Sequence, residues 1–391
     1  LKIRRHTVAA DLERFGRLAV PERFGGTGAG MLDLARSITR LAADCPTAAG
    51  MLAVHSTIGA VTAVAAFGSD EQQSRFLPGL AAGDPLSIFG ATEPDAGCDL
   101  HAVRAVLERR HGRLFLTGTK MFITNATHGR LMKVLALSDG SPTVALVRLP
   151  ESDGPTFRLR HYAIHPLRHA RNAAVEFTGF AVDEADLLAA PGGDGMRIVW
   201  HGLNRGRTTL AAQAAGTLRI LLAQARAHAL ARATWGRPIA DRELVRGRLA
   251  RIAAAIAACD AVSAWAAAAI DSGGTGELEA IVAKTTASEC VRAAAIDALG
   301  VHGGRAFLVG HPLGDSFHDH LAVGVYEGES DLLGLALLKG LAKGWPPAAV
   351  GRDASALRRA GEWLAWRAAS LAGTAGRDAG ILDRRLRDHA R

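Results

Sequence analysis

One carboxylate in an apolar block is the first candidate for chemistry. Glu327 stands in the run Val325-Tyr326-Glu327-Gly328, shortly before a stretch with helical periodicity over 330–343. Burial beside apolar groups raises the pKa of a glutamate toward neutral pH, which suits a general base. A solvated glutamate that complements the dipole of the following helix is the alternative interpretation.

The chain that must position this carboxylate has the size and composition of a multidomain globular protein. It has 391 residues, 49% of them hydrophobic and 21% charged, and a chain this long folds as two or three packed units. It lacks the apolar block of a signal peptide, no apolar run of bilayer length stands out, and its four cysteines have neither metal nor disulfide spacing. These features predict a cytoplasmic protein without a membrane span. Because the chain begins at Leu1 rather than Met, we expect part of the natural N-terminus to precede it.

The composition and hydrophobic pattern of the sequence change twice along the chain. They predict an α+β fold with a helical N-terminal domain, a middle antiparallel β-barrel and a C-terminal four-helix bundle. Residues 1–85 are rich in Ala and Leu, which favours helices. Residues 86–195 carry short runs of strand formers separated by turn residues. From 196 to 349 apolar residues recur at helical steps, and 350–391 carry extra C-terminal helical patterns. The bundle helices are expected at 206–233, 242–271, 277–299 and 330–343.

Five short motifs occur in order along these segments. They are TEPDAGCD at 92–99, KMFITN at 120–125, RATWGRPI at 232–239, HGG at 302–304 and VYEG at 325–328. They resemble the T-E-P-x-A-G-S-D, K-x-W-I-T-N, R-x-x-F-G-x-P-I, x-G-G and I-Y-E-G-T blocks of the acyl-CoA dehydrogenase superfamily. Each motif alone is weak, but five ordered matches within about 20–345, together with the matching textures, make a strong joint signal.

The resemblance implies the removal of two hydrogens across the α and β carbons of an acyl thioester. A positioned base draws off the α-proton while the β-hydride leaves to an acceptor. No side chain accepts hydride, whereas a flavin does so at N5, and FAD is the cofactor that the resemblance implies. The base of the family's Y-E-G block corresponds to Glu327. Some members carry the base on the first bundle helix instead, at a position that is Asn204 here and cannot take a proton.

The resemblance also assigns residues to the cofactor and the substrate. Thr92 and Thr124 resemble threonines that hydrogen-bond the flavin ring, and Phe122 replaces the tryptophan that packs on it. Cys98 replaces a serine near the thioester, and Arg207 lies where the family has an arginine lining the acyl-CoA channel. Ordinary strand threonines and a solvated arginine are the alternatives. The other residues assigned by the motifs are Ile123, Trp235, Gly303 and Gly304 for the cofactor, and Tyr326 and Gly328 for the substrate.

Among the residues expected at the nucleotide half of FAD, one matches the family's motif and three differ from it. Arg232 resembles an arginine that reaches the FAD pyrophosphate of a neighbouring subunit, which implies a homodimer or homotetramer. Gly300 replaces a glutamine, Glu329 the threonine of Y-E-G-T, and Leu333 a second glutamine. Since the family uses these three positions on the adenosine side, we expect FAD to be held differently or more weakly there.

Charge and composition limit the partners. The net charge of +8 suits an anionic partner such as CoA or an acidic carrier protein. With 5% aromatic residues and no basic stripe, the sequence does not point to nucleic acid. His318-Asp319-His320 matches no zinc signature, so no metal site is predicted. The family's usual electron acceptor is an electron-transfer flavoprotein.

Four functions stay open. The first is an acyl-CoA dehydrogenase, and a close variant acts on an acyl group held by an acyl carrier protein. The third is a flavin-dependent N-oxygenase on the same fold, but such relatives generally lack the Y-E-G glutamate. The fourth is a catalytically inactive flavin or CoA binder, which the departures on the adenosine side keep open.

Overall fold

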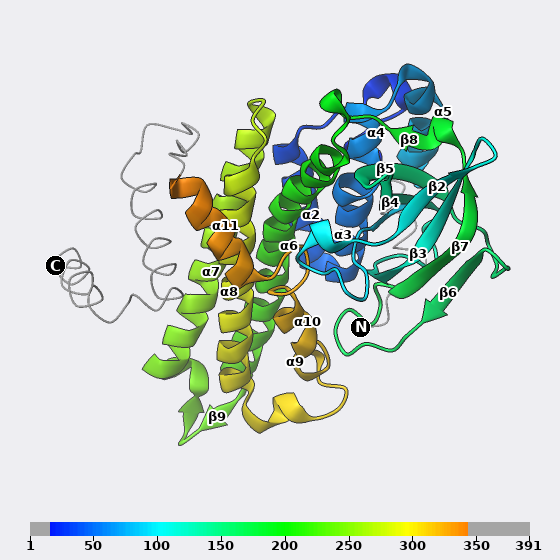
Figure 1. The fold of residues 1–391 in the computed structure, drawn as a ribbon. Coiled ribbons are helices and arrows are strands. Elements are labelled where there is room, and N and C mark those ends of the chain that lie inside the picture. The colour runs from blue at the N-terminus through cyan, green and yellow to red at the C-terminus, as the bar shows by residue number, and fades with distance from the viewer. Residues whose placement is uncertain (1–15, 343–391) are drawn as a thin grey trace.

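The structure is a computed structural model that describes residues 16–342 (Figure 1). The β-sheet lies at one side of the molecule, the long C-terminal helices lie at the other, and α2 and α3 lie between them. The expected helices of 350–391, including their tryptophans, lie outside the described residues.

The N-terminal segment is helical, as its Ala- and Leu-rich sequence predicts. In α2, residues such as Leu34, Ile38 and Leu41 repeat at three- and four-residue steps and are buried. Ser69 and Gln72 form a capping box that begins α5. The elements are α2 (Met31–Asp44), α3 (Pro46–Ala53), the π-helix η2 (Val54–Ile58), α4 (Val61–Phe67) and α5 (Asp70–Ala82).

The middle segment is an eight-stranded sheet with the order β6-β7-β3-β2-β4-β5-β8, and β1 pairs with β4. Most pairs are antiparallel, as predicted, although β4 runs parallel to β1 and β2. The expectation of a closed barrel needs correction, because β6 and β8 end the sheet without pairing with each other. The strands are β1 (Ser87–Gly90), β2 (Val106–Arg110), β3 (Arg113–Ile123), β4 (Leu131–Ser138), β5 (Ser141–Arg148), β6 (Phe157–His161), β7 (Ala173–Val182) and β8 (Leu187–Leu188).

The C-terminal segment is built on three long helices, α6 (Gly195–Ala231), α7 (Glu243–Asp271) and α8 (Glu277–His302). The α6 helix begins eleven residues before the expected start at 206, because Asp194 caps it by accepting a hydrogen bond from the Met196 N–H. Small alanines let the three helices pack closely around one apolar core.

The fourth expected bundle helix is displaced from the central position. α11 (Ser330–Ala342) packs on α8 through a separate small cluster that includes Ile281 and Leu337. On the other side of the bundle, α2 packs against α6 and α7, and Ile38 and Ala212 share that core. The short elements are β9 (Ala233–Thr234), β10 (Arg237–Pro238), α9 (Pro312–Asp315) and α10 (Phe317–Ala322).

Two helical stretches have the length and hydropathy of a membrane span, so the expectation that no such run occurs is wrong. They are Pro46–Phe67 and Glu243–Asp271, and 61% and 33% of their most apolar windows are buried in the protein. Core helices of globular proteins have the same properties. The first stretch is divided among α3, η2 and α4, and the second is α7 of the bundle.

Candidate active site

Glu327 lies in a loop between α10 and α11, residues 323–329, which we call the glutamate loop. Lys284 of α8 is fully buried, and its Nζ donates hydrogen bonds to the carbonyl oxygens of Gly324 at 3.0 Å and Gly328 at 2.5 Å. Lys284 therefore fixes the backbone on both sides of Glu327.

The backbone of Glu327 is strained and held. Its φ of 57° lies in the left-handed region, which costs a non-glycine residue of order 1–3 kcal/mol. Arg207 of α6 is buried and donates a hydrogen bond from Nε to the Glu327 carbonyl oxygen at 2.9 Å. Because this bond and those from Lys284 fix the conformation, the protein itself sets the direction of the carboxylate. Tyr326, the preceding residue, packs against the core of the bundle.

The Glu327 carboxylate has the environment of a general base. Its Oε2 is shielded from solvent and has no hydrogen-bond partner among the described residues, although the residue as a whole keeps some accessible surface. A Cβ on Gly206 of α6 would lie 2.8 Å from Oε2, so only glycine lets the helix approach this closely. Burial raises the pKa of Glu327 to about 7, although Arg207 and Lys284 lower it. Such a carboxyl group gains and loses a proton near neutral pH.

The β unit meets the glutamate loop at Cys98. The Cys98 Sγ accepts a hydrogen bond from the Glu329 N–H at 3.5 Å. The Glu329 carboxylate accepts from the N–H groups of Asp331 and Leu332, both at 3.0 Å, and so caps the start of α11. Leu333 is buried against α8. Two of the three departures from the family pattern thus serve the packing of α11.

A buried ion pair orders the segment that carries Thr92. Lys120 and Glu93 are 2.6 Å apart, and both side chains are buried. The Glu93 carboxylate also accepts hydrogen bonds from the backbone N–H groups of Arg104 and Ala105, the two residues before β2. The Thr92 carbonyl oxygen accepts from Met121 N–H at 2.8 Å. Thr92 is therefore tied to the end of β3, where the other expected flavin contacts lie.

An aromatic platform stands at the end of β3. The Phe122 ring is 59% exposed, Tyr162 packs edge-on to it at 5.6 Å, and the Phe122 N–H donates to the Tyr162 hydroxyl at 2.5 Å. The Thr124 hydroxyl donates to Asn172 Oδ1 at 3.4 Å, while Asn172 Nδ2 is buried without a partner among the described residues. Ile123, between them, faces the sheet core. A flat ligand with polar edges would cover the exposed ring and satisfy the amide.

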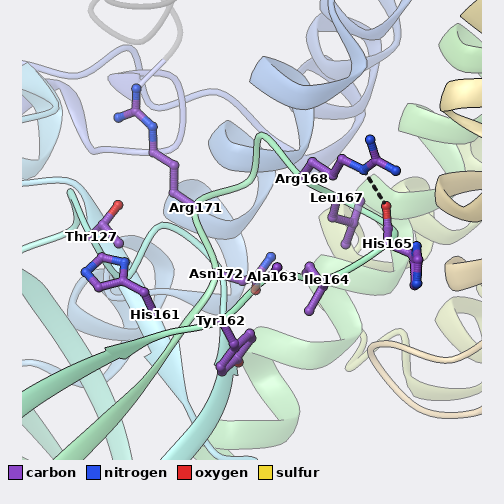
Figure 2. Close-up of a pocket in the computed structure, with 10 residues that line it drawn as sticks. All are labelled: Thr127, His161, Tyr162, Ala163, Ile164, His165, Leu167, Arg168, Arg171 and Asn172. Atoms are coloured by element: carbon purple, nitrogen blue, oxygen red, sulfur yellow. Dashed lines mark hydrogen bonds between the residues drawn. The ribbon is translucent and has the colours of Figure 1, made fainter. Parts of the chain in front are cut away.

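A cavity of about 630 Å³ adjoins this platform. Figure 2 shows His165 and Arg168 at one end, Arg171 at the other, and Tyr162 and Asn172 between them. Guanidinium groups at both ends favour an anionic ligand. The cavity is lined by Thr127, His161, Tyr162, Ala163, Ile164, His165, Leu167, Arg168, Arg171 and Asn172.

The loop between β6 and β7, residues 162–172, lines much of this cavity and also contacts α10, which leads into the glutamate loop. The Leu167 N–H donates to Asp319 Oδ1 at 2.5 Å, and His165 stacks on His318 at 4.9 Å. His318 and Asp319 thus connect the β unit with the bundle. Within residues 16–342 no three His, Cys, Asp or Glu side chains gather in a way that could hold a metal ion.

The residues expected at the nucleotide half of FAD lie far from Glu327 in the same chain. Arg232 and the 90% exposed Trp235 follow the C-terminal end of α6. Gly303 and Gly304 lie at the end of α8, which is the same end of the bundle. Arg232 is 25 residues beyond Arg207, or about 37 Å along a helix. One chain therefore does not bring both groups to one site.

The third departure is linked to an arginine. A Cβ on Gly300 would lie 1.1 Å from Nη1 of Arg248, so the Arg248 side chain occupies the place that the glutamine takes in the family. Arg248 and Gly300 lie at the end of the bundle that carries the β9–β10 hairpin, which we call the hairpin end. A guanidinium is therefore available where the family has the carboxamide of its glutamine.

Comparison with known proteins covers nearly all of the described chain. The family's N-terminal domain matches residues 6–84, its middle domain 88–180 and its C-terminal domain 193–342. The chain belongs to the acyl-CoA dehydrogenase family. Members of this family are oxidoreductases, and the fold described above is theirs.

Individual relatives agree with the family. An acyl-CoA dehydrogenase of Bacillus subtilis is 30% identical over 330 residues, which cover 84% of this chain and 86% of that protein. The solved prolyl acyl carrier protein oxidase AnaB has a TM-score of 0.80 at 24% identity, covering 86% of this chain and 89% of that one. PigA, solved with FAD and proline, has a TM-score of 0.79 at 23% identity, covering 86% and 88%.

Sequence reasoning missed several residues of the site. Lys284 interrupts an apolar helix face that includes Ala280, Ala287 and Val291, and a lone cation on such a face was the available signal. Tyr162 and Asn172 follow β6 in a loop without a motif, so the sequence held no comparable signal for them.

Proposed function

We propose that this protein is an FAD-dependent dehydrogenase that removes the α-proton and β-hydride of an acyl thioester, with Glu327 as the base. The observation that carries this proposal is the Glu327 carboxylate, which is held in a fixed loop, is shielded at Oε2 and has a pKa raised to about 7. A solvated helix-start glutamate would have none of these properties.

The platform at the end of β3 fits a flavin. Phe122 would cover one face of the ring, and the hydroxyls of Thr92 and Thr124 and the unsatisfied Asn172 amide would bind its polar edge. When bound, FAD supplies the acceptor for the β-hydride. Glu327 takes the α-proton at a carboxylate oxygen, while Lys284 and Arg207 keep that carboxylate in place. Cys98 lies beside the glutamate loop, where we place the thioester.

The hairpin end of the bundle serves a second copy of the chain in this proposal. Arg232, Trp235, Gly303 and Gly304 are exposed there and would contact the nucleotide half of the neighbour's FAD in a homodimer or homotetramer. Arg248 would take over from the missing glutamine at Gly300. A monomer by light scattering that still holds FAD would refute the assembly. A nanomolar dissociation constant in equilibrium dialysis would show that Arg248 and its neighbours fully compensate for the departures.

The thioester carrier is CoA or an acyl carrier protein. The relationship to the Bacillus subtilis acyl-CoA dehydrogenase favours CoA, while the likeness to AnaB keeps a carrier protein as the second candidate. We further propose an electron-transfer flavoprotein as the acceptor and the cytoplasm as the location. Comparing CoA and carrier-protein thioesters of one acyl group as substrates decides between the two carriers.

The function is tested by the absorption spectrum of the purified protein under anaerobic conditions. We expect a flavin spectrum that is bleached on addition of an acyl thioester, with the trans-2-enoyl thioester as product by mass spectrometry. A flavin that is reduced only by a nicotinamide cofactor and then oxygenates an amine would instead establish the N-oxygenase. A protein without flavin would support the inactive binder.

A further inference from the structure

A second buried cation lies close to the glutamate loop and has neither a hydrogen-bond nor an ionic partner among the described residues. Lys133 of β4 is fully buried, and its Nζ has no hydrogen-bond partner among the described residues. The polar atom lies 4.5 Å from the centre of the Phe89 ring. The other two lysines that are fully buried within residues 16–342 differ, because Lys120 pairs with Glu93 and Lys284 binds carbonyl oxygens. A buried charge without compensation is costly, so Lys133 requires an explanation.

The surroundings of Lys133 are cationic or neutral. His201 and Arg205 are four residues apart near the start of α6. The His201 ring accepts a hydrogen bond from Arg205 Nη1 at 3.1 Å. Burial lowers the pKa of His201 to about 3, with a further lowering by Arg205 and Lys133. The ion pairs formed within residues 16–342 include neither Lys133 nor Arg205. Asp271 acts on Arg205 electrostatically, whereas burial alone shifts the pKa of Lys133. An incoming anion would therefore find Lys133 without a competing carboxylate partner.

Lys133 and the catalytic carboxylate lie on the same face of α6. A Cβ on Gly202 would lie 2.7 Å from Lys133 Nζ, just as one on Gly206 would lie 2.8 Å from Glu327 Oε2. Gly202 and Gly206 are four residues apart, so they stack on one helix face about 6 Å apart. The ammonium group and the base therefore contact α6 at positions about one helical turn apart.

The segment between these two groups keeps accessible surface. Ile58 touches the positions of both glycines, with its Cα 3.3 Å from the Cβ position of Gly202 and its Cγ2 2.3 Å from that of Gly206. Within 51–61 only Val54 and Ile58 are half-buried, and the other residues are buried. They belong to the π-helix η2, a conformation that is frequent at functional sites. An acyl chain that runs from Glu327 along Ile58 would end at Lys133.

We propose that the acyl group of the substrate carries a second, distal carboxylate, and that Lys133 binds it when the α carbon lies at Glu327. One helical turn between the two glycine positions, with a contact distance at each end, suits a short dicarboxylic acyl group of about five carbons. Burial lowers the pKa of Lys133 to about 7, and a bound carboxylate would restore its charged form. This inference rests on the proposed function, because it places the α carbon at Glu327.

The test uses the FAD-loaded full chain and two pantetheine thioesters of matched shape. S-glutarylpantetheine carries the distal carboxylate, and S-(5-methylhexanoyl)pantetheine replaces it with an uncharged isopropyl group. Dissociation constants are measured by anaerobic calorimetry, and flavin reduction by stopped-flow absorbance. We expect the wild type to bind the glutaryl thioester at least about tenfold more tightly. Lys133→Met, which keeps the volume and removes the charge, should abolish or reverse that preference without lowering the thermal midpoint.

Two further variants serve as controls for the role of the Lys133 charge. Lys133→Gln keeps a hydrogen-bond donor and should show an intermediate preference. Lys339→Met removes an exposed lysine of α11 and should leave the ratio between the two thioesters unchanged.

The outcomes separate this inference from the proposed function. If the uncharged thioester binds and bleaches the flavin as well as the glutaryl one, the dehydrogenase proposal stands and the role of Lys133 is refuted. If the glutaryl preference depends on Lys133 but neither thioester bleaches the flavin, the anion site stands and the dehydrogenase proposal fails. If neither thioester binds, the inference is refuted, and the anaerobic bleaching test with CoA and carrier-protein thioesters decides on the dehydrogenase. Should Lys133→Met fail to fold, the wild-type ratio decides alone, and a ratio near one refutes the inference.

Discussion

The glutamate loop and the platform at the end of β3 form the two sides of one proposed site, but they are built in opposite ways. Lys284 and Arg207 fix the loop with short hydrogen bonds to its backbone. The platform has an exposed Phe122 ring, one long hydrogen bond from Thr124 and an unsatisfied amide on Asn172. The protein thus supplies the geometry of the base before any ligand binds, whereas the platform is completed by its ligand. Changes in the loop should therefore have large effects, and changes in the platform small ones.

The largest effect is expected for Glu327→Gln. The amide fills the same space but cannot accept a proton, so flavin reduction by a saturating acyl thioester should slow by a factor of about 10² to 10⁴. Stopped-flow bleaching measures this rate, and flavin content and size serve as controls. A rate within a few-fold of the wild type would remove Glu327 as the base.

The same experiment can be sharpened by moving the base. Asn204 is buried on α6, with its Oδ1 unsatisfied among the described residues. Combining Glu327→Gln with Asn204→Glu should recover part of the lost rate, because the family also uses that position. No recovery would mean that Asn204 does not reach the α-proton in this chain.

The next effect concerns the anchor of the loop. Lys284→Met removes the donor of the Gly328 carbonyl oxygen and one donor of the Gly324 carbonyl oxygen, which keeps its bond from the Ser330 N–H. Losing these charged hydrogen bonds should lower the free energy of unfolding by about 3 kcal/mol. Urea denaturation checks this value. Lys339→Met, on the exposed face of α11, is the matched control and should change it by less than about 0.5 kcal/mol. Equal effects of the two changes would show that Lys284 does not anchor the loop.

A smaller effect on flavin reduction is expected when the pH is changed. Since burial raises the pKa of Glu327 to about 7, the carboxyl group is mostly protonated below that pH and cannot act as a base. Flavin reduction should therefore rise about tenfold from pH 6 to pH 8. The opposite sign holds for stability, because the raised pKa favours the folded state at acid pH and this contribution is lost as the pH rises through 7. A pH-independent reduction rate would contradict the assignment.

The smallest effect is expected on the platform. Thr124→Ala removes a long hydrogen bond and one proposed flavin contact, so flavin reduction should slow only a few-fold, with loss of less than about 1 kcal/mol of stability. Stopped-flow reduction and thermal unfolding measure the two quantities. Unchanged reduction would remove Thr124 from the site. A collapse as large as that of Glu327→Gln would erase the contrast between loop and platform.

The sequence predicted the elements well and the contacts of the site only in part. The helical spacing of apolar residues and the composition predicted both ends of α7 and α8 to within three residues. Long apolar helices that end at clear turn residues allow few alternative boundaries. The open edge of the sheet could not be predicted, because closure depends on whether the short β8 meets β6. The motif revealed Glu327, but Lys284 escaped because its partners are backbone atoms 40 and 44 residues away. Its role depends on tertiary packing that no local pattern encodes.

The continuous helix α6 limits how this protein can change its length. Between Gly206, which faces Glu327, and Arg232 the helical ladder is unbroken, so each inserted or deleted residue would turn everything beyond it by about 100° and shift it by about 1.5 Å. A single deletion would rotate buried residues such as Leu218 and Leu221 toward solvent and turn the hairpin away. A seven-residue change nearly restores the helical phase. Insertions and deletions in α6 should therefore be tolerated only in whole helical repeats, even though substitutions on its exposed face are not restricted in this way.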